Sequence, residues 1–87
     1  MTYTVEWSTG AEKQLARLDR PVARTLVHFM DERVHRASNP RSIGKQLRDS
    51  DFWRYRVGDY RILCRIEDRT LVVLVVELGH RREVYRR

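Results

Sequence analysis

Residues 52–67, FWRYRVGDYRILCRIE, constrain the fold of this chain more than any other stretch. Apolar and polar residues alternate on both sides of Gly58-Asp59, and a two-residue link between alternating segments predicts a β-hairpin. Val57 then pairs with Tyr60, and the rest of the register follows, with directly opposed side chains on one face. The residues that lie together on one face, here called the arginine face, are Arg54, Arg56, Arg61 and Arg65.

The arginine face places Arg56 directly opposite Arg61, where like charges cost stability. Two interpretations remain open: the side chains extend into water, as on the wet side of many half-buried sheets, or they are retained to bind an anion. Trp53, Tyr55 and Tyr60 lie nearby in the sequence. Arginines interleaved with aromatic rings suit RNA, because guanidinium groups pair with phosphates and unpaired bases stack on rings.

The charge balance also favours a polyanionic partner. The chain of 87 residues has 18 basic and 12 acidic residues, which gives a net charge of +6. Lys13 and Lys45 are its lysines, so 16 of the basic residues are arginine, the residue that makes forked contacts with phosphate and carboxylate groups. A genome rich in G and C also raises arginine content, so this bias alone does not identify the partner.

Length and composition predict one globular domain over residues 1–87. No apolar run approaches the roughly 18 residues of a membrane span, and MTYTVEWSTG lacks the basic start and apolar centre of a signal peptide. Cys64 has no second cysteine to pair with, which fits a reduced, cytoplasmic protein. His28 and His35 lack further ligands at metal-binding spacing, so we expect no metal there.

The N-terminal half predicts two helices. Thr9 and Glu12 have the spacing of a capping box, which marks a helix start. Apolar residues at helical spacing then predict a first helix over 11–18 and a second over 22–37, with Pro21 in the first turn of the second. Two helices joined by so tight a turn form an αα-hairpin.

The rest of the chain predicts a sheet around the β-hairpin. Residues 2–7 alternate like a strand, residues 41–51 are polar like a loop, and residues 70–78 are apolar on both faces, like a covered central strand. Gly79 should end that strand, and residues 83–85 should form a short last one. The predicted fold is α+β with the order β-α-α-β-β-β, an antiparallel sheet of about four strands packed on an N-terminal αα-hairpin.

The segments WRYRVGDYRIL and LGHRREVY, with the apolar strand between them, resemble the RelE/ParE superfamily of bacterial toxins, and its RelE branch in particular. The resemblance covers nearly the whole chain, including QLR at 46–48. It implies a cytoplasmic toxin of a type II toxin-antitoxin system, held inactive by a cognate antitoxin in a hetero-oligomer. It also implies cleavage of messenger RNA in the A site of the 30S ribosome, without a metal or other cofactor.

The resemblance also implies roles for individual residues in an attack by the ribose 2′-OH on the neighbouring phosphate, which leaves a cyclic phosphate and a 5′-OH. Arg61 matches a phosphate-binding arginine, Arg81 the arginine assigned to the leaving group, and Tyr85 a tyrosine that orients or stacks on the substrate. Arg54 and Arg56 stand where well-studied relatives carry lysines. A guanidinium stays charged in proteins, so these two can stabilise charge but cannot accept the 2′ proton.

The group that accepts the 2′ proton is the open part of this assignment. His80 is a nearby side chain of the type that transfers protons near neutral pH, although it could equally do no more than end a strand beside Gly79. Glu83 is a weaker candidate, and positioning together with charge stabilisation could supply the rate without a strong base. The remaining cations expected to bind the substrate are Arg65, Arg82, Arg48 and Lys45.

Two other functions compete with RNA cleavage. The ParE branch is implied to share the fold and to poison DNA gyrase without nuclease chemistry, and a third possibility is an RNA-binding module with no activity. Toxins of the ParE branch generally lack the cationic set together with a terminal tyrosine. That combination is present here and favours the nuclease; its members are Arg54, Arg56, Arg61, Arg81 and Tyr85.

Overall fold

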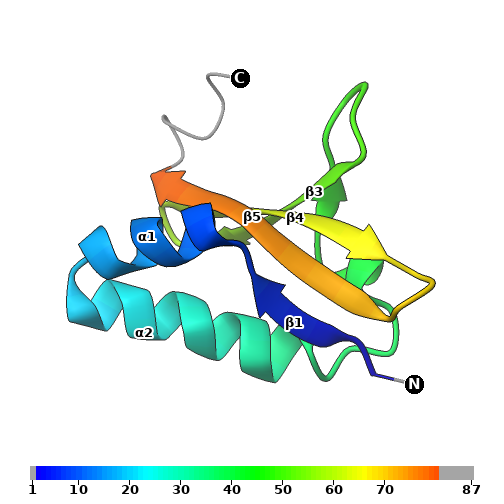
Figure 1. The fold of residues 1–87 in the computed structure, drawn as a ribbon, viewed down its shortest axis with the longest axis horizontal. Coiled ribbons are helices and arrows are strands. Elements are labelled where there is room, and N and C mark those ends of the chain that lie inside the picture. Colours follow the sequence, from blue (N-terminus) through cyan, green and yellow to red (C-terminus); the bar gives the residue numbers. More distant parts are fainter. Residues whose placement is uncertain (1, 81–87) are drawn as a thin grey trace.

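The computed structural model describes residues 2–80, in which a five-stranded sheet carries two helices on one face (Figure 1). The strand order is β1-β5-β4-β3-β2. The bounds are β1 Thr4–Trp7, α1 Thr9–Arg17, α2 Arg20–Phe29, β2 Lys45–Gln46, β3 Phe52–Val57, β4 Tyr60–Glu67 and β5 Val72–His80. The predicted α+β class and the N-terminal helical hairpin are confirmed.

Two strands differ from the predicted antiparallel sheet of about four. β1 pairs with β5 in parallel, with Thr4 beside Val72. A second addition, β2, lies in the stretch predicted to be a loop and pairs with β3. Backbone groups make this ladder, so the polar side chains of Lys45–Gln46 gave no sign of it.

The predicted hairpin register is confirmed along its whole length. Val57 pairs with Tyr60, Arg56 with Arg61, and the ladder continues to Phe52 opposite Arg65. Gly58 in the turn has a φ of 59°, a left-handed conformation that a residue without Cβ adopts at little cost.

β5 does not end at Gly79 as predicted. The strand runs through Gly79 to His80, because the two residues pair with Arg61 and Tyr60 of β4. On the other edge of β5, which β1 leaves open beyond Val75, the Leu78 N–H donates to Gln14 Oε1 at 2.8 Å. The short strand predicted around 83–85 lies outside the described residues.

The first helix begins one residue earlier than the capping-box spacing predicted. Ser8, not Thr9, is the N-cap, and its hydroxyl oxygen accepts a hydrogen bond from the Ala11 N–H at 3.0 Å. Pro21 lies in the first turn of α2 as predicted. The second helical segment then continues as a π-helical turn over Met30–Val34.

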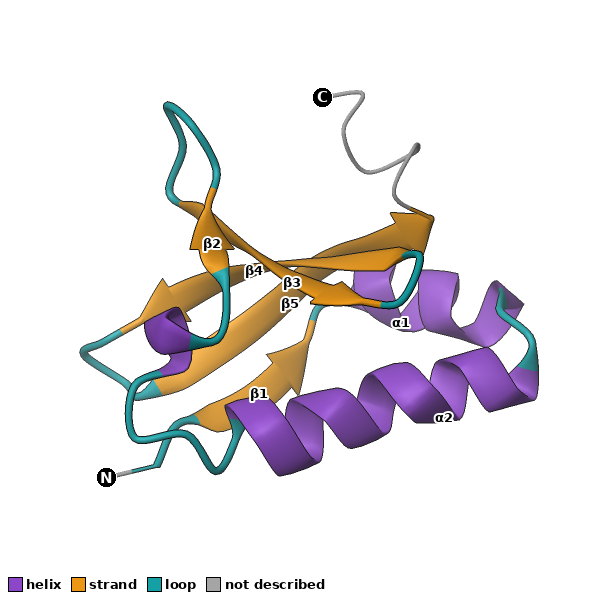
Figure 2. Ribbon diagram, turned by 180° about the vertical axis from the view of Figure 1, so that it is seen from behind, coloured by secondary structure: helices purple, strands orange, loops and turns teal. Residues whose placement is uncertain are grey.

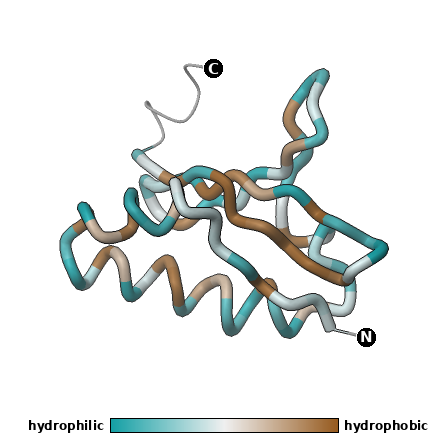
Figure 3. The backbone as a smooth tube through the Cα atoms, in the orientation of Figure 1, coloured by the Kyte–Doolittle hydropathy of each residue, from teal (hydrophilic) through white to brown (hydrophobic). Residues whose placement is uncertain are grey.

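The core lies between the helices and one face of the sheet. The buried residues of the second helical segment, Leu26, Met30 and Val34, belong to the same cluster as Val73 and Val75 of β5, the most continuously hydrophobic strand in Figure 3. Burial strongly raises the pKa of the Cys64 thiol. The side chain is therefore a protonated core residue and not a nucleophile.

Gly44 permits the close approach of the segment before β2 to β3. A Cβ at this position would lie 2.8 Å from the Arg54 carbonyl oxygen and 2.8 Å from Cε1 of Tyr55. The Tyr55 side chain is fully buried, and its hydroxyl donates to the Pro40 carbonyl oxygen at 2.8 Å. Neither neighbour can therefore move aside at low cost.

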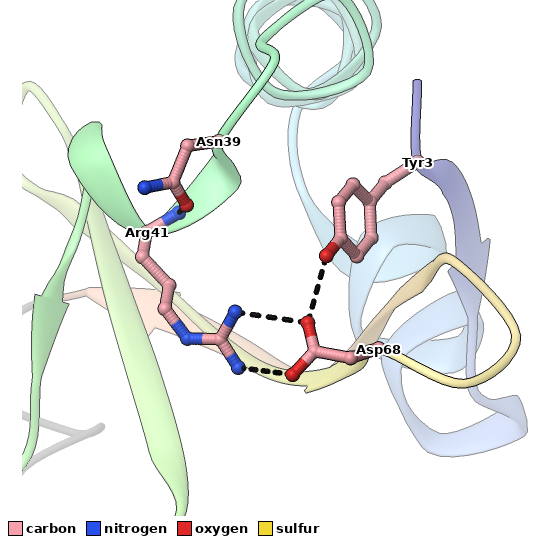
Figure 4. A network of polar contacts seen from close by, with 4 residues as sticks. All are labelled: Tyr3, Asn39, Arg41 and Asp68. Carbon is pink, nitrogen blue, oxygen red and sulfur yellow. Dashed lines mark hydrogen bonds and ion pairs between the residues drawn. The ribbon is translucent and has the colours of Figure 1, made fainter. Parts of the chain in front are cut away.

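A polar cluster closes the end of the sheet away from the hairpin turn (Figure 4). Arg41 donates to both carboxylate oxygens of Asp68 at 2.9 Å each, and the Tyr3 hydroxyl donates to Asp68 Oδ1 at 2.7 Å. The Arg41 guanidinium also lies 5.7 Å from the ring centroid of Trp53. The cluster thus connects the residue before β1, the 3₁₀ turn Pro40–Ser42 and the β4–β5 turn.

This cluster predicts a pH dependence of stability. Hydrogen bonds from Arg41, and then from Tyr3, lower the pKa of Asp68 to about 2. The ionised carboxylate therefore stabilises the fold above its unfolded pKa near 4, and this stabilisation is lost as the pH falls from about 4 to about 2. In urea unfolding, Asp68→Asn should be less stable than wild type at pH 6, and the difference should shrink by pH 2. An equal difference at both pH values would contradict the assignment.

Gly44→Ala should destabilise the protein by about 1–3 kcal/mol through overpacking. Gly10→Ala is the matched control, because its nearest contact would be Ser8 Oγ at 4.0 Å and it lies within α1. That change should stabilise the protein by about 0.4–1 kcal/mol. Urea midpoints measure both effects. A Gly44→Ala variant as stable as wild type would show that the segment before β2 can shift away from β3.

Candidate functional site

The structure assembles the predicted arginine face on the side of the sheet away from α1 and α2 (Figure 2). Arg56 is opposite Arg61 in the register, and the alternating residues Tyr55 and Ile62 are buried in the core. β2 extends the face, because Lys45 is in register with Arg54. The cations brought together are Lys45, Arg54, Arg56, Arg61 and Arg65.

The members of the arginine face differ in burial. Arg56 and Arg65 are exposed, Arg54 is half-buried, and Arg61 is only 5% exposed. Arg61 Nη1 donates to the Tyr60 carbonyl oxygen at 3.3 Å, and its neighbour in β5 is Gly79, which puts no side chain beside it. A cation held in a partly dehydrated place attracts an anion more strongly than one in water.

The arginine face also carries acids. Arg65 Nε lies 3.5 Å from Glu67 Oε1, with both side chains about half exposed, so this pair contributes little stability. Glu77 is in register with Leu63, which places it on the same face. Sequence reasoning missed Glu77, although a single acid within the apolar run VVLVVEL was a signal.

A β-bulge explains why Glu77 was missed. The β4–β5 register shifts between Leu63 and Cys64, so that Cys64 pairs with Val75 while Leu63 pairs with Glu77. Val76 is the extra residue, and the alternation of faces along β5 changes there. Strict alternation from the buried Val73 and Val75 would have put Glu77 in the core.

The same bulge moves His80 away from the arginine face. His80 pairs with Tyr60, and the two rings meet edge to face with centroids 5.8 Å apart. A cleft of about 310 Å³ lies on this side, between β5 and α1. Its lining residues are Gln14, Arg17, Leu18, Tyr60, Leu78, Gly79 and His80. His80 therefore does not lie beside Arg61 as the sequence suggested.

The aromatic residues that lie near the arginines in sequence, Trp53, Tyr55 and Tyr60, are on the opposite face of the sheet. The Tyr55 ring is in the core, Tyr60 meets His80, and Trp53 is half-buried opposite Cys64. Successive side chains in a strand point to opposite faces, so neighbours in sequence are separated by the sheet. Among the described residues of β3 and β4, the ring that shares the arginine face is Phe52, which is half-buried opposite Arg65.

The remaining predicted residues are Arg48, Arg81, Arg82 and Tyr85. Arg48 is in the turn between β2 and β3, a loop that projects away from the helices (Figure 2). Arg81, Arg82 and Tyr85 lie outside the described residues. Within residues 2–80, no three His, Cys, Asp or Glu side chains are grouped so that they could hold a metal ion, and no helix is long and apolar enough to cross a membrane.

The comparisons with known proteins connect this geometry to a family. A family model described as the ParE toxin of the type II toxin-antitoxin system parDE matches residues 5–85. Toxin RelG of Mycobacterium tuberculosis is 34% identical over 89 residues, and the match covers 100% of both chains.

Solved structures show the same fold. The RelBE2 toxin-antitoxin complex of M. tuberculosis matches with a TM-score of 0.85 and 31% identity, over 93% of this chain and 100% of the other. The archaeal RelE–RelB complex of Pyrococcus horikoshii matches with a TM-score of 0.72 and 27% identity, over 93% and 97%. A mutant of E. coli RelE in the free state, 24% identical, has a TM-score of 0.78 over 98% and 92%.

The opposition of Arg56 to Arg61 predicts that the arginine face costs stability. Arg56→Gln should raise the stability by about 0.2–1 kcal/mol at low salt, because it removes a like-charge pair. The gain should shrink in about 0.5 M salt, which screens exposed charges. Arg69→Gln, in the exposed β4–β5 turn, is the control without an opposed cation. Urea unfolding at both salt concentrations measures the effect, and a loss of stability in Arg56→Gln at low salt would contradict it.

Proposed function

This chain belongs to the RelE/ParE superfamily of type II toxin-antitoxin toxins, and we propose that it cleaves messenger RNA in the A site of the ribosome. The observation that carries the proposal is the arginine face, with the exposed Arg56 opposite the buried Arg61. Anion binding on a rigid sheet supplies the charge stabilisation that phosphate cleavage requires. Retaining a like-charge pair there, against its cost in stability, fits a phosphate-binding surface.

In the proposed reaction the ribose 2′ oxygen attacks the adjacent phosphorus and the 5′ oxygen leaves. Arg61 binds the scissile phosphate, and Arg54 and Arg56 stabilise the charge that builds up on its oxygens in the transition state. Lys45 and Arg65 extend the cationic surface for neighbouring phosphates. Arg81 and Tyr85 keep the roles that the family resemblance implies, at the leaving group and on the substrate.

The proposed partners are the 30S ribosome with its messenger RNA and a cognate antitoxin, all in the cytoplasm. The M. tuberculosis and P. horikoshii relatives were solved as complexes with antitoxins. An antitoxin segment with acidic or apolar residues would cover or distort the arginine face, since acidic side chains pair with guanidinium groups. The toxin and antitoxin would form a hetero-oligomer in which the face no longer reaches RNA.

Inhibition of DNA gyrase is the alternative, because the matching family model is described by the ParE toxin. The arginine face distinguishes the two functions: an RNA-cleaving toxin uses these cations in catalysis, whereas a gyrase poison needs no cationic catalytic set. The resemblance in GDYR and GHRREVY favours the nuclease.

The test is cleavage of a defined messenger RNA by purified toxin, with and without programmed ribosomes, in chelator. Wild-type protein should cut within the A-site codon only when ribosomes are present. Arg54→Gln should slow cleavage by about 10²–10³-fold, as the loss of one charge-stabilising group does, whereas Arg69→Gln should not. Folded toxin that leaves the message intact but blocks DNA supercoiling by gyrase would replace the proposal with the alternative.

A further inference from the structure

Glu77 is a carboxylate that the fold places on the arginine face at its β5 side. The register runs from Lys45 and Arg54 through Leu63 to Glu77, so the four side chains form one row across four strands. Glu77 is half-buried, and Leu63 beside it is 3% exposed. The carboxylate is therefore next to an apolar side chain, on a part of the face that solvent still reaches.

Glu77 is also a diagonal neighbour of the buried Arg61. Arg61 pairs with Gly79, and Glu77 precedes Gly79 by two residues on the same face. Diagonal neighbours in an antiparallel pair lie about 7–8 Å apart, within reach of long side chains. A phosphate bound by Arg61 would thus have the Glu77 carboxylate to one side, on the same face of the sheet.

The cleavage reaction needs a proton acceptor that the arginines cannot supply, because a guanidinium remains charged. His80 lies on the other face of the sheet, against Tyr60. Glu77 carries a carboxylate that can accept a proton, and it lies on the same face as the arginines. We propose that Glu77 is a catalytic residue of this toxin, the general base that accepts the proton of the attacking ribose 2′-OH. The inference rests on the proposed function.

The step balances within the groups present. A Glu77 carboxylate oxygen takes the 2′ proton while the 2′ oxygen forms its bond to phosphorus. The bond from phosphorus to the 5′ oxygen then breaks, a guanidinium stabilises the charge on the leaving oxygen, and that oxygen takes a proton from water. The products are a 2′,3′-cyclic phosphate and a 5′-OH, and the hydroxide left by the water takes the proton from Glu77.

A purely structural role for Glu77 makes a different prediction. If its charge only offset the repulsion among Arg54, Arg61 and their neighbours, replacing it would change stability and RNA affinity but not the proton transfer. An external carboxylate could then restore nothing. Rescue of the rate by a small acid anion therefore separates the general base from a counter-charge.

The experiment measures single-turnover cleavage on programmed ribosomes with saturating toxin. Glu77→Gln should lower the rate constant by about 10²–10⁴-fold, the range of general-base catalysis, with unchanged ribosome binding. Glu77→Ala should be equally slow, and added formate should accelerate it at least fivefold. Sodium chloride at equal ionic strength is the control, because phosphate contacts weaken with salt.

Two matched variants complete the test. Glu67→Gln removes a carboxylate on the same face, beside Arg65, and should keep the rate within threefold. His80→Gln, on the other face of the sheet, should also keep the cleavage rate within threefold of wild type.

A Glu77→Gln variant within threefold of wild type, or a slow Glu77→Ala variant that formate does not rescue, would overturn the assignment of Glu77 and leave the proposed function standing. Wild-type toxin that does not cut ribosome-bound message would overturn both.

Discussion

The pairing of β4 with β5 is the interaction on which the rest of this structure depends. β4 supplies the buried Ile62 and Cys64 to the core on one face and Arg61 and Arg65 to the other. The helices cover one face of the apolar strand β5, and β1 pairs with the edge of β5 that β4 does not occupy. Because both strands are held on two sides, the charged side chains are carried by a backbone that cannot easily yield to their repulsion.

The bulge in that pairing decides whether Glu77 or His80 lies on the arginine face. A single extra residue, Val76, exchanges the faces of everything that follows it in β5. Glu77 thereby joins the arginines and His80 joins Tyr60. In a relative with lysines at the positions of Arg54 and Arg56, one of these hairpin lysines could accept the proton. The two guanidinium groups of this chain cannot. The carboxylate from the neighbouring strand fills that chemical need.

Much of the fold was predictable because local patterns and the final structure agree. The alternation around Gly58-Asp59 predicted every pair of the hairpin, since a two-residue turn leaves only one register. The helical spacing of Leu26, Met30 and Val34 predicted the face that is buried. The parallel pairing of β1 and the short β2 were not predicted, because backbone hydrogen bonds between distant segments leave no mark on side-chain patterns.

The sequence by itself determined the class of fold and the arginine face, because each depends on residue types at short, regular spacing, and its motifs resemble the family to which the chain belongs. The tertiary structure alone decided how that face is completed. Whether Glu77 or His80 stands beside Arg61 depends on one register shift between strands that meet only after folding. The burial of Arg61 to 5% exposure is likewise a property of the folded chain. Neither can be read from a strand considered alone, because alternation describes one strand and a site is made by several.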